Sequence, residues 1–191
     1  MPLILASTSI YRRQLLERLG IAFTIGRPDI DESPLDGEAP AHTAERLAVA
    51  KARVLADQHP DALVIGSDQV AHLGAHRFGK PGTVENAVAQ LQQMRGQRVV
   101  FHTAVALINS RTGHTQLAGV PTTVHFRDLS DAEIIRYVDK EMPLDCAGAA
   151  KAEGLGISLL EALSGDDPTA LIGLPLIALS RMLRAEGIEL P

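Results

Sequence analysis

Two long stretches of apolar and β-branched residues constrain the fold of this chain more than any other feature. They cover residues 99–109 and 115–126 and flank the segment Ser110-Arg111-Thr112-Gly113. A turn-forming segment between two such stretches predicts a β-hairpin. Because strands joined by a short turn run antiparallel, the sheet must include antiparallel pairs.

Shorter strand and helix patterns alternate along the rest of the chain. We expect further strands at 3–6, 21–25, 62–72 and 154–162, and helices at 10–19, 43–58, 83–96, 130–140 and 175–187. Residues 27–40 contain three prolines and five acids and predict a loop. The pattern predicts an α/β fold with a mixed twisted sheet flanked by helices.

The composition favours one globular domain covering residues 1–191. Hydrophobic residues make up 46% of the chain and charged residues 21%, which is ordinary for a folded domain. Aromatic residues make up only 3%, so Ala, Leu, Val and Ile must build the core.

The net charge and the cysteine content limit which binding partners and which cellular compartment we expect. A net charge of −5 argues against a nucleic-acid polymer as partner, although a few local cations can still bind a small anion. Cys146 is the only cysteine, so no internal disulfide forms, which fits a reducing compartment. No apolar stretch suits a signal peptide or a membrane span, and we expect a cytoplasmic protein without membrane contact.

Arg12 and Arg13 occupy the predicted first turn of a helix, directly after Ser7-Thr8-Ser9. The helix dipole disfavours cations at this end unless an anion lies nearby. Free N–H groups and two guanidinium groups make a suitable phosphate site. The alternative is a pair of solvated arginines on a surface helix.

Asp68 follows the apolar run Leu63-Val64-Ile65 inside a predicted strand. A carboxylate is costly in such a position unless it is paired or binds a metal. Asp68 is therefore a candidate general base or metal ligand, or else an aspartate that only caps a turn. Glu32, Lys51 and Lys80 are isolated charges that the sequence pattern alone would not select. The histidines and Cys146 form no metal-binding or nucleophile motif.

Together these blocks resemble the Maf family of nucleoside triphosphate pyrophosphatases. Residues 5–16 are similar to the family's opening signature. Further blocks match in order at Asp31-Glu32, Arg46-Leu47-Ala48, Lys51-Ala52, Gly66-Ser67-Asp68-Gln69, Gly79-Lys80-Pro81, residues 143–148, Glu153-Gly154 and Gly173-Leu174-Pro175-Leu176. The resemblance covers nearly the whole chain.

The resemblance implies a fold similar to the inosine triphosphate pyrophosphatases, with two lobes and a central cleft. It implies hydrolysis of a nucleoside triphosphate to the monophosphate and pyrophosphate with Mg²⁺ or Mn²⁺, serving the house-cleaning of modified nucleotides. Asp68 would accept the proton of the attacking water or bind the metal, and Glu32 would bind the metal or position water. The phosphate-binding residues would be Arg12, Arg13, Lys51 and Lys80. A homodimer is compatible with the resemblance.

Tyr11, Gln69 and Glu153 occupy the positions that separate the family's substrate branches. Gln69 and Glu153 resemble the branch that acts on 7-methyl-GTP, whereas the dTTP and UTP branch usually carries Thr and Gln there. Tyr11 departs from the Trp typical of the 7-methyl-GTP branch, but it keeps an aromatic face for a cationic purine. Three alternatives remain open: a dTTP or UTP pyrophosphatase, a nucleotide-binding regulator of septum formation, and an α/β domain for a sugar phosphate.

Overall fold

The chain forms two compact units in the computed structural model, which describes residues 1–191. The first unit comprises residues 1–69, 103–120 and 167–191, and the second comprises residues 70–102 and 121–166. Two units agree with the two lobes expected from the sequence. The central cleft and the assignment of residues 1–191 to a single domain stay predictions.

The strands belong to a mixed sheet, as the hairpin required. They are β1 (Leu3–Ala6), β2 (Thr24–Gly26), β3 (Leu63–Leu73), β4 (His76–Phe78), β5 (Arg98–Asn109), β6 (Thr115–Phe126) and β7 (Leu160–Ser164). The order is β2-β1-β3-β5-β6-β7, and β4 pairs with β3. β1 pairs in parallel with β2 and β3, whereas the β3–β4 and β6–β7 pairs are antiparallel.

Three of the five helices begin after a residue whose side chain caps them. They are α1 (Ile10–Glu17), α2 (Pro40–Ala56), α3 (Val84–Met94), α4 (Asp131–Glu141) and α5 (Leu176–Ala185). Ser9, Thr83 and Ser130 are the side-chain N-caps of α1, α3 and α4, and Ser130 forms a capping box with Glu133. None of the helices combines the length and apolar character that a membrane-spanning helix needs.

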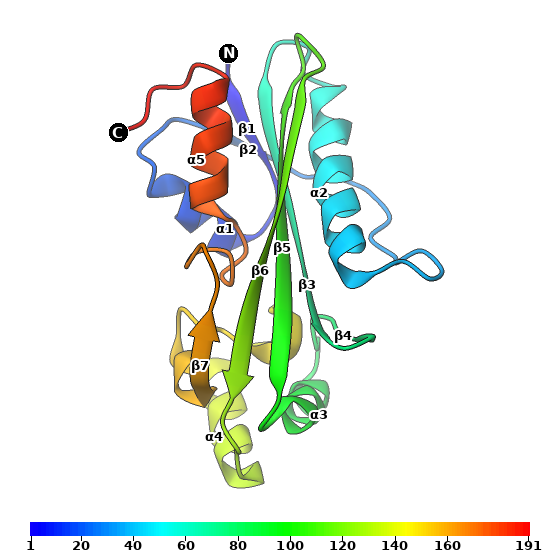
Figure 1. The fold of residues 1–191 in the computed structure, drawn as a ribbon, viewed down its shortest axis with the longest axis vertical. Helices are drawn as coiled ribbons and strands as arrows, with labels where there is room; N and C mark the ends of the chain where they lie inside the picture. The colour runs from blue at the N-terminus through cyan, green and yellow to red at the C-terminus, as the bar shows by residue number, and fades with distance from the viewer. The chain divides into compact units, whose positions relative to one another are not determined.

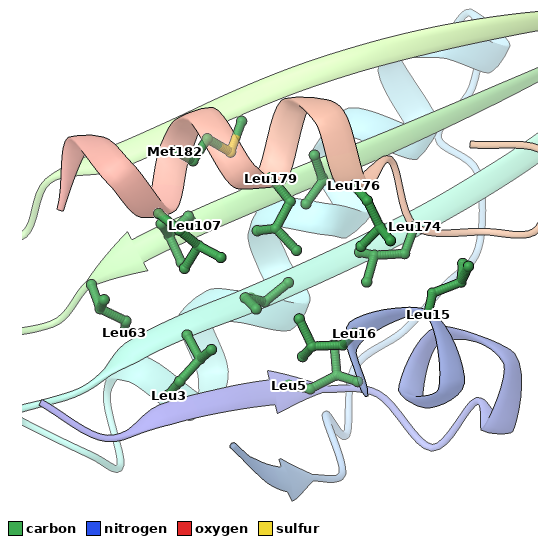
Figure 2. Packing of buried hydrophobic residues seen from close by; sticks show 13 residues of the cluster. Leu3, Leu5, Leu15, Leu16, Leu63, Leu107, Leu174, Leu176, Leu179 and Met182 are labelled. Carbon is green, nitrogen blue, oxygen red and sulfur yellow. The ribbon is translucent and has the colours of Figure 1, made fainter. Parts of the chain in front are cut away.

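Aliphatic side chains build the core of the first unit. In Figure 1, α1 and α5 lie on one side of this unit's strands and α2 lies on the other. Figure 2 shows Leu176, Leu179 and Met182 of α5 in one buried cluster with Leu107 of β5. Leu15 and Leu16 of α1 complete the same cluster. The low aromatic content therefore does not prevent a continuous core, since branched aliphatic side chains fill it.

The second unit packs α3 against α4, and short 3₁₀ turns cover both helices. Residues 147–149 form one turn against α3, and residues 155–159 form another against α4. Phe101 and Phe126 are buried here. Two of the chain's few aromatic residues thus contribute to the core of this unit.

The expected strand at 154–162 is wrong over residues 155–159, which form the second 3₁₀ turn before β7 begins at Leu160. The backbone N–H groups of Gly154 and Gly156 both donate to Lys151 O at 3.0 Å, and Leu155 N donates to Glu141 Oε2 at 2.7 Å. These hydrogen bonds hold the backbone in a turn in place of a strand.

Three smaller differences concern two element ends and one additional strand. The second strand begins at Thr24 rather than residue 21, and α2 begins at Pro40 rather than residue 43. Proline suits the first helical turn because its missing N–H would have no partner there. The short strand β4 was not expected from the sequence.

Candidate active site

A buried ion pair lies at the centre of the candidate site. Lys51 Nζ of α2 is 2.6 Å from Asp68 Oδ1 of β3. The two residues are only 5% and 7% exposed. Removing one partner of such a pair would leave an uncompensated buried charge, so each residue depends on the other. The structure therefore brings together two of the residues predicted from the sequence.

Gly66 allows helix α2 to lie close enough for this pair to form. A Cβ atom at Gly66 would collide with the backbone of α2, at Ala48 O and Ala52 N. The glycine and Asp68 are two residues apart on β3, so both face α2. Close approach of the helix at Gly66 thus brings Lys51 to Asp68.

Ser67 and Gln69 alternate with Asp68 and make hydrogen bonds to a different segment. Ser67 Oγ donates to Ala104 O at 2.8 Å and to Gly173 O at 2.9 Å. Gln69 Nε2 donates to Thr103 Oγ1 at 2.8 Å and to Leu171 O at 2.9 Å. With its nitrogen held by these acceptors, the Gln69 amide has a fixed orientation, and Oε1 accepts no hydrogen bond within the chain.

Arg12 belongs to the same neighbourhood. Its Nε donates to Gly173 O at 2.9 Å, the carbonyl that also accepts from Ser67. Desolvation lowers the pKa of the Arg12 guanidinium, and the nearby carboxylates of Asp68 and Glu32 oppose this shift. Because arginine keeps its charge in proteins, a desolvated guanidinium is well suited to bind an anion.

Glu32 reaches the ion pair from the loop before α2. Its Oε1 is 2.9 Å from Lys51 Nζ, so one ammonium group contacts two carboxylates. The Glu32 side chain is 54% exposed, in contrast to Asp68. Glu32 therefore lies at the solvent side of the ion pair, where an incoming ligand can reach it.

Arg13 and Tyr11 lie beside Arg12 on α1 with different surroundings. Arg13 is exposed, and its Nε is 2.8 Å from Glu17 Oε1 one helical turn further along. Tyr11 is half-buried. The structure places Arg13 in a surface ion pair, whereas Arg12 lies near Asp68. The roles predicted for Arg13 and Tyr11 stay predictions.

Lys80 and Glu153 lie in the second unit, and both are exposed. Partial desolvation raises the pKa of the Glu153 carboxyl, and the carboxylates of Glu141 and Asp145 add to the rise. The Lys151 ammonium, whose Nζ is also 2.7 Å from Glu141 Oε1, opposes this rise. A cationic partner would thus stabilise the charged form of the Glu153 carboxyl group.

The second unit also contains a cavity of about 220 Å³. It is lined by Arg127, Leu129, Glu133, Arg136, Tyr137, Lys140, Leu155, Ser158 and Leu159. None of the residues predicted for phosphate or base recognition lines it, so this cavity is not part of the predicted site.

Sequence reasoning missed the residues that hold the site together. Ser67 and Gly173 were quoted only as members of motifs, yet the Gly173 carbonyl joins Ser67 to Arg12. Glu38 and Arg46 were not singled out, although Arg46 Nε is 2.6 Å from Glu38 Oε1 beside the loop that carries Glu32. An arginine five residues before Lys51 on the same helix was the available signal.

The fold and this ion pair define an α/β protein with a charged site where strand β3 meets helix α2. The family described as Maf-like protein matches residues 2–186, and the chain belongs to this family. The 7-methyl-GTP pyrophosphatase of Aromatoleum aromaticum is 68% identical over 99% of this chain and 97% of its own length.

A second relative and one solved structure complete the comparison. The 7-methyl-GTP pyrophosphatase of Thiobacillus denitrificans is 57% identical over 98% of this chain and 93% of its own. The solved structure of the Staphylococcus aureus Ham1 protein aligns with 67% of this chain and 73% of its own, at 15% identity and a TM-score of 0.47.

Proposed function

We propose that this chain hydrolyses 7-methyl-GTP to 7-methyl-GMP and pyrophosphate. The observation that carries the proposal is the 68% identity to a 7-methyl-GTP pyrophosphatase over 99% of the chain. The geometry supports the same chemistry, because a buried carboxylate with a neighbouring ammonium and guanidinium suits attack on a phosphoric anhydride. A cytoplasmic location, a homodimer and the absence of a nucleic-acid polymer partner belong to this proposal.

In the proposed reaction, Asp68 accepts the proton of the attacking water. Lys51 fixes Oδ1 at 2.6 Å, and Oδ2 makes no hydrogen bond within the chain, which leaves it available to water. Arg12 binds the triphosphate through the guanidinium nitrogens that do not bond to Gly173. Arg13, Lys51 and Lys80 supply further positive charge, which stabilises the negative charge that builds up on the phosphate oxygens.

The residues present fit a divalent metal that is also bound by the substrate phosphates. No group of three or more His, Cys, Asp or Glu side chains could hold a metal ion by itself. Glu32 and Asp68 both contact Lys51 Nζ, so their carboxylates already converge on one cation. Mg²⁺ is commonly bound by one or two carboxylates together with substrate phosphates. We propose that these two residues hold Mg²⁺ or Mn²⁺, which when bound would neutralise phosphate charge.

For base recognition we propose Tyr11, Gln69 and Glu153. The fixed Gln69 amide presents Oε1 as an acceptor. The Glu153 carboxylate can accept from the N1–H and N2–H₂ edge of guanine and offset the positive charge of 7-methylguanine. Tyr11 would stack on the cationic ring. Desolvation raises the pKa of the Glu153 carboxyl, and a bound cationic base would favour its charged form.

Pyrophosphate release from a panel of nucleoside triphosphates tests the proposal. We expect 7-methyl-GTP to be turned over with a higher kcat/KM than GTP, dTTP or UTP in the presence of Mg²⁺. A preference for dTTP or UTP would contradict the choice of base. Binding without turnover of any nucleotide would favour a nucleotide-binding regulator instead.

A further inference from the structure

The loop that carries Glu32 has little apolar packing to hold it. Residues 27–39 contain no helix or strand, and residues 31–37 are all exposed. Yet Glu32 Oε1 lies 2.9 Å from the buried Lys51 ammonium. An exposed segment without apolar contacts samples many conformations unless polar contacts restrain it. Such restraints lie at Glu38 and Arg46.

Glu38 accepts hydrogen bonds from both sides of the loop's junction with α2. Arg46 Nε is 2.6 Å from Oε1 and Arg46 Nη2 is 2.8 Å from Oε2, which is a two-point pairing. Oε2 also accepts from Thr43 Oγ1 at 2.8 Å and from Leu35 N at 3.1 Å. The carboxylate therefore ties the loop backbone at Leu35 to two side chains of α2.

Arg46 extends this tie to the residue next to Glu32. Its Nη2 donates to Ser33 O at 3.1 Å. The Ser33 N–H in turn donates to Asp31 Oδ1 at 2.9 Å. Both neighbours of Glu32 are thereby fixed in the chain, one directly by Arg46 and the other through Ser33.

The pair is shielded well enough to act as a fixed contact. The side chains of Glu38 and Arg46 are only 10% and 31% exposed. Hydrogen bonds from Arg46 hold the pKa of the Glu38 carboxyl at about 2, far below its usual range. A planar guanidinium fits a carboxylate at two points, which a lysine cannot do.

We propose that Arg46 and Glu38 are positioning residues that fix the loop so that the Glu32 carboxylate stays at Lys51. They touch neither substrate nor metal, and they act only through Glu32. The inference rests on the proposed function, because the role of Glu32 in turnover belongs to it. The sequence places Arg46 on the helix of Lys51, and the structure adds its three hydrogen bonds with the loop.

A double-mutant cycle in the full chain tests this proposal. We expect Arg46→Met to lower kcat by about 10- to 100-fold with a smaller change in KM, as displacement of a site group by about 1 Å does. In a Glu32→Gln background, Arg46→Met should not lower kcat further, because the Glu32 carboxylate through which Arg46 acts is already absent. The kcat of Arg46→Lys should lie between those of the wild type and Arg46→Met, since lysine retains the charge but makes only one contact with Glu38.

Arg53→Met supplies the matched control. Arg53 lies on the same helix, and its Nη2 donates to Thr115 Oγ1 at 3.0 Å, away from the loop. We expect wild-type kcat for this variant. Hydrogen exchange should become faster at residues 33–38 in Arg46→Met and stay unchanged in Arg53→Met.

Three outcomes would overturn the proposal: wild-type kcat in Arg46→Met, an undiminished effect of Arg46→Met in the Glu32→Gln background, or unchanged exchange at residues 33–38. The failure of the proposed function is distinct, because it appears as absence of pyrophosphate release from the wild-type protein. In that case the exchange measurement still decides whether Arg46 and Glu38 hold the loop.

Discussion

Two carboxyl groups predicted to act on one substrate have opposite electrostatic surroundings. Asp68 of the first unit is buried and paired with the Lys51 ammonium at 2.6 Å. Glu153 of the second unit is exposed, and the lysine near it is paired with Glu141 instead. Asp68 has a directly paired counter-charge within the chain, whereas the Lys151 ammonium near Glu153 is ion-paired with Glu141. In the proposed function, Asp68 is the fixed charge for chemistry and Glu153 is the acceptor for a cationic base.

The largest expected effect tests the first half of this comparison. Asp68→Asn removes the proton acceptor while keeping size and one hydrogen bond to Lys51. We expect kcat for 7-methyl-GTP to fall by about 10²- to 10⁴-fold, as loss of a general base does. Pyrophosphate release measures this effect. Asp61→Asn is the control, because Asp61 is exposed and pairs only with Arg111. Equal loss in both variants would mean that the position of Asp68 has no special role.

A second prediction concerns the approach of α2 to β3. Gly66→Ala places a methyl group against Ala48 O and Ala52 N, which are backbone atoms that cannot turn aside. We expect the free energy of unfolding to fall by roughly 1–3 kcal/mol, as for other overpacked core sites. Chemical denaturation measures it. Gly79→Ala should have little effect on stability, since nothing lies within 4 Å of its added methyl group.

The third prediction tests the second half of the comparison. Glu153→Gln removes the negative charge proposed to face 7-methylguanine. We expect kcat/KM for 7-methyl-GTP to fall by about 10-fold, the value of one hydrogen bond to a charged group, and that for GTP to fall less. Melting temperature should hardly change because Glu153 is exposed. Glu161→Gln, an exposed glutamate of β7, is the control. An equal loss for both nucleotides would exclude recognition of the base charge.

The smallest expected effect is on acid stability and compares two other carboxylates. Glu38 of the first unit and Glu133 of the second each have a pKa lowered from the usual 4.5 to about 2. A lowered folded-state pKa stabilises the fold above about pH 4.5, and this contribution disappears as the pH falls toward 2. Glu38→Gln and Glu133→Gln should therefore both lower the melting temperature at pH 7.

The same two variants separate stability from turnover. Their melting temperatures should approach that of the wild type as the pH falls through 2, because protonation then removes the charges of Glu38 and Glu133 in the wild-type protein. Only Glu38→Gln should also lower kcat, since Glu133 caps α4 and holds no site residue. A melting-temperature difference that persists unchanged to pH 2 would contradict the assigned charge effect.

Patterns local in sequence predicted the elements well. The long hairpin, the five expected helices and the loop before α2 are all present. Periodicity and capping depend on neighbours within a few residues, so a sequence can display them. The error at residues 155–159 arose because a side chain 14 residues away, Glu141, binds the backbone there. No local pattern reports such a contact.

The sequence pattern also identified Asp68 as an unusual residue, and the family resemblance identified the charged residues expected to act with it. It could not say which partner lies nearest. Lys51 lies within 2.6 Å of Asp68 because Gly66 lets α2 approach β3, and Arg13 turns to Glu17 on the surface. Which of two adjacent arginines lies near the carboxylate depends on helix rotation against the core, and that is fixed by packing of Leu15 and Leu16.

By itself, the sequence determined the mixed α/β class, the family and the set of charged residues, because these depend on residue type and spacing. Tertiary structure alone decided how those charges are used. It pairs Asp68 with Lys51, gives Arg12 the Gly173 carbonyl, and joins Arg46 to Glu38 beside Glu32. The physical reason is that charge pairing depends on distance and desolvation, which only the packed chain sets.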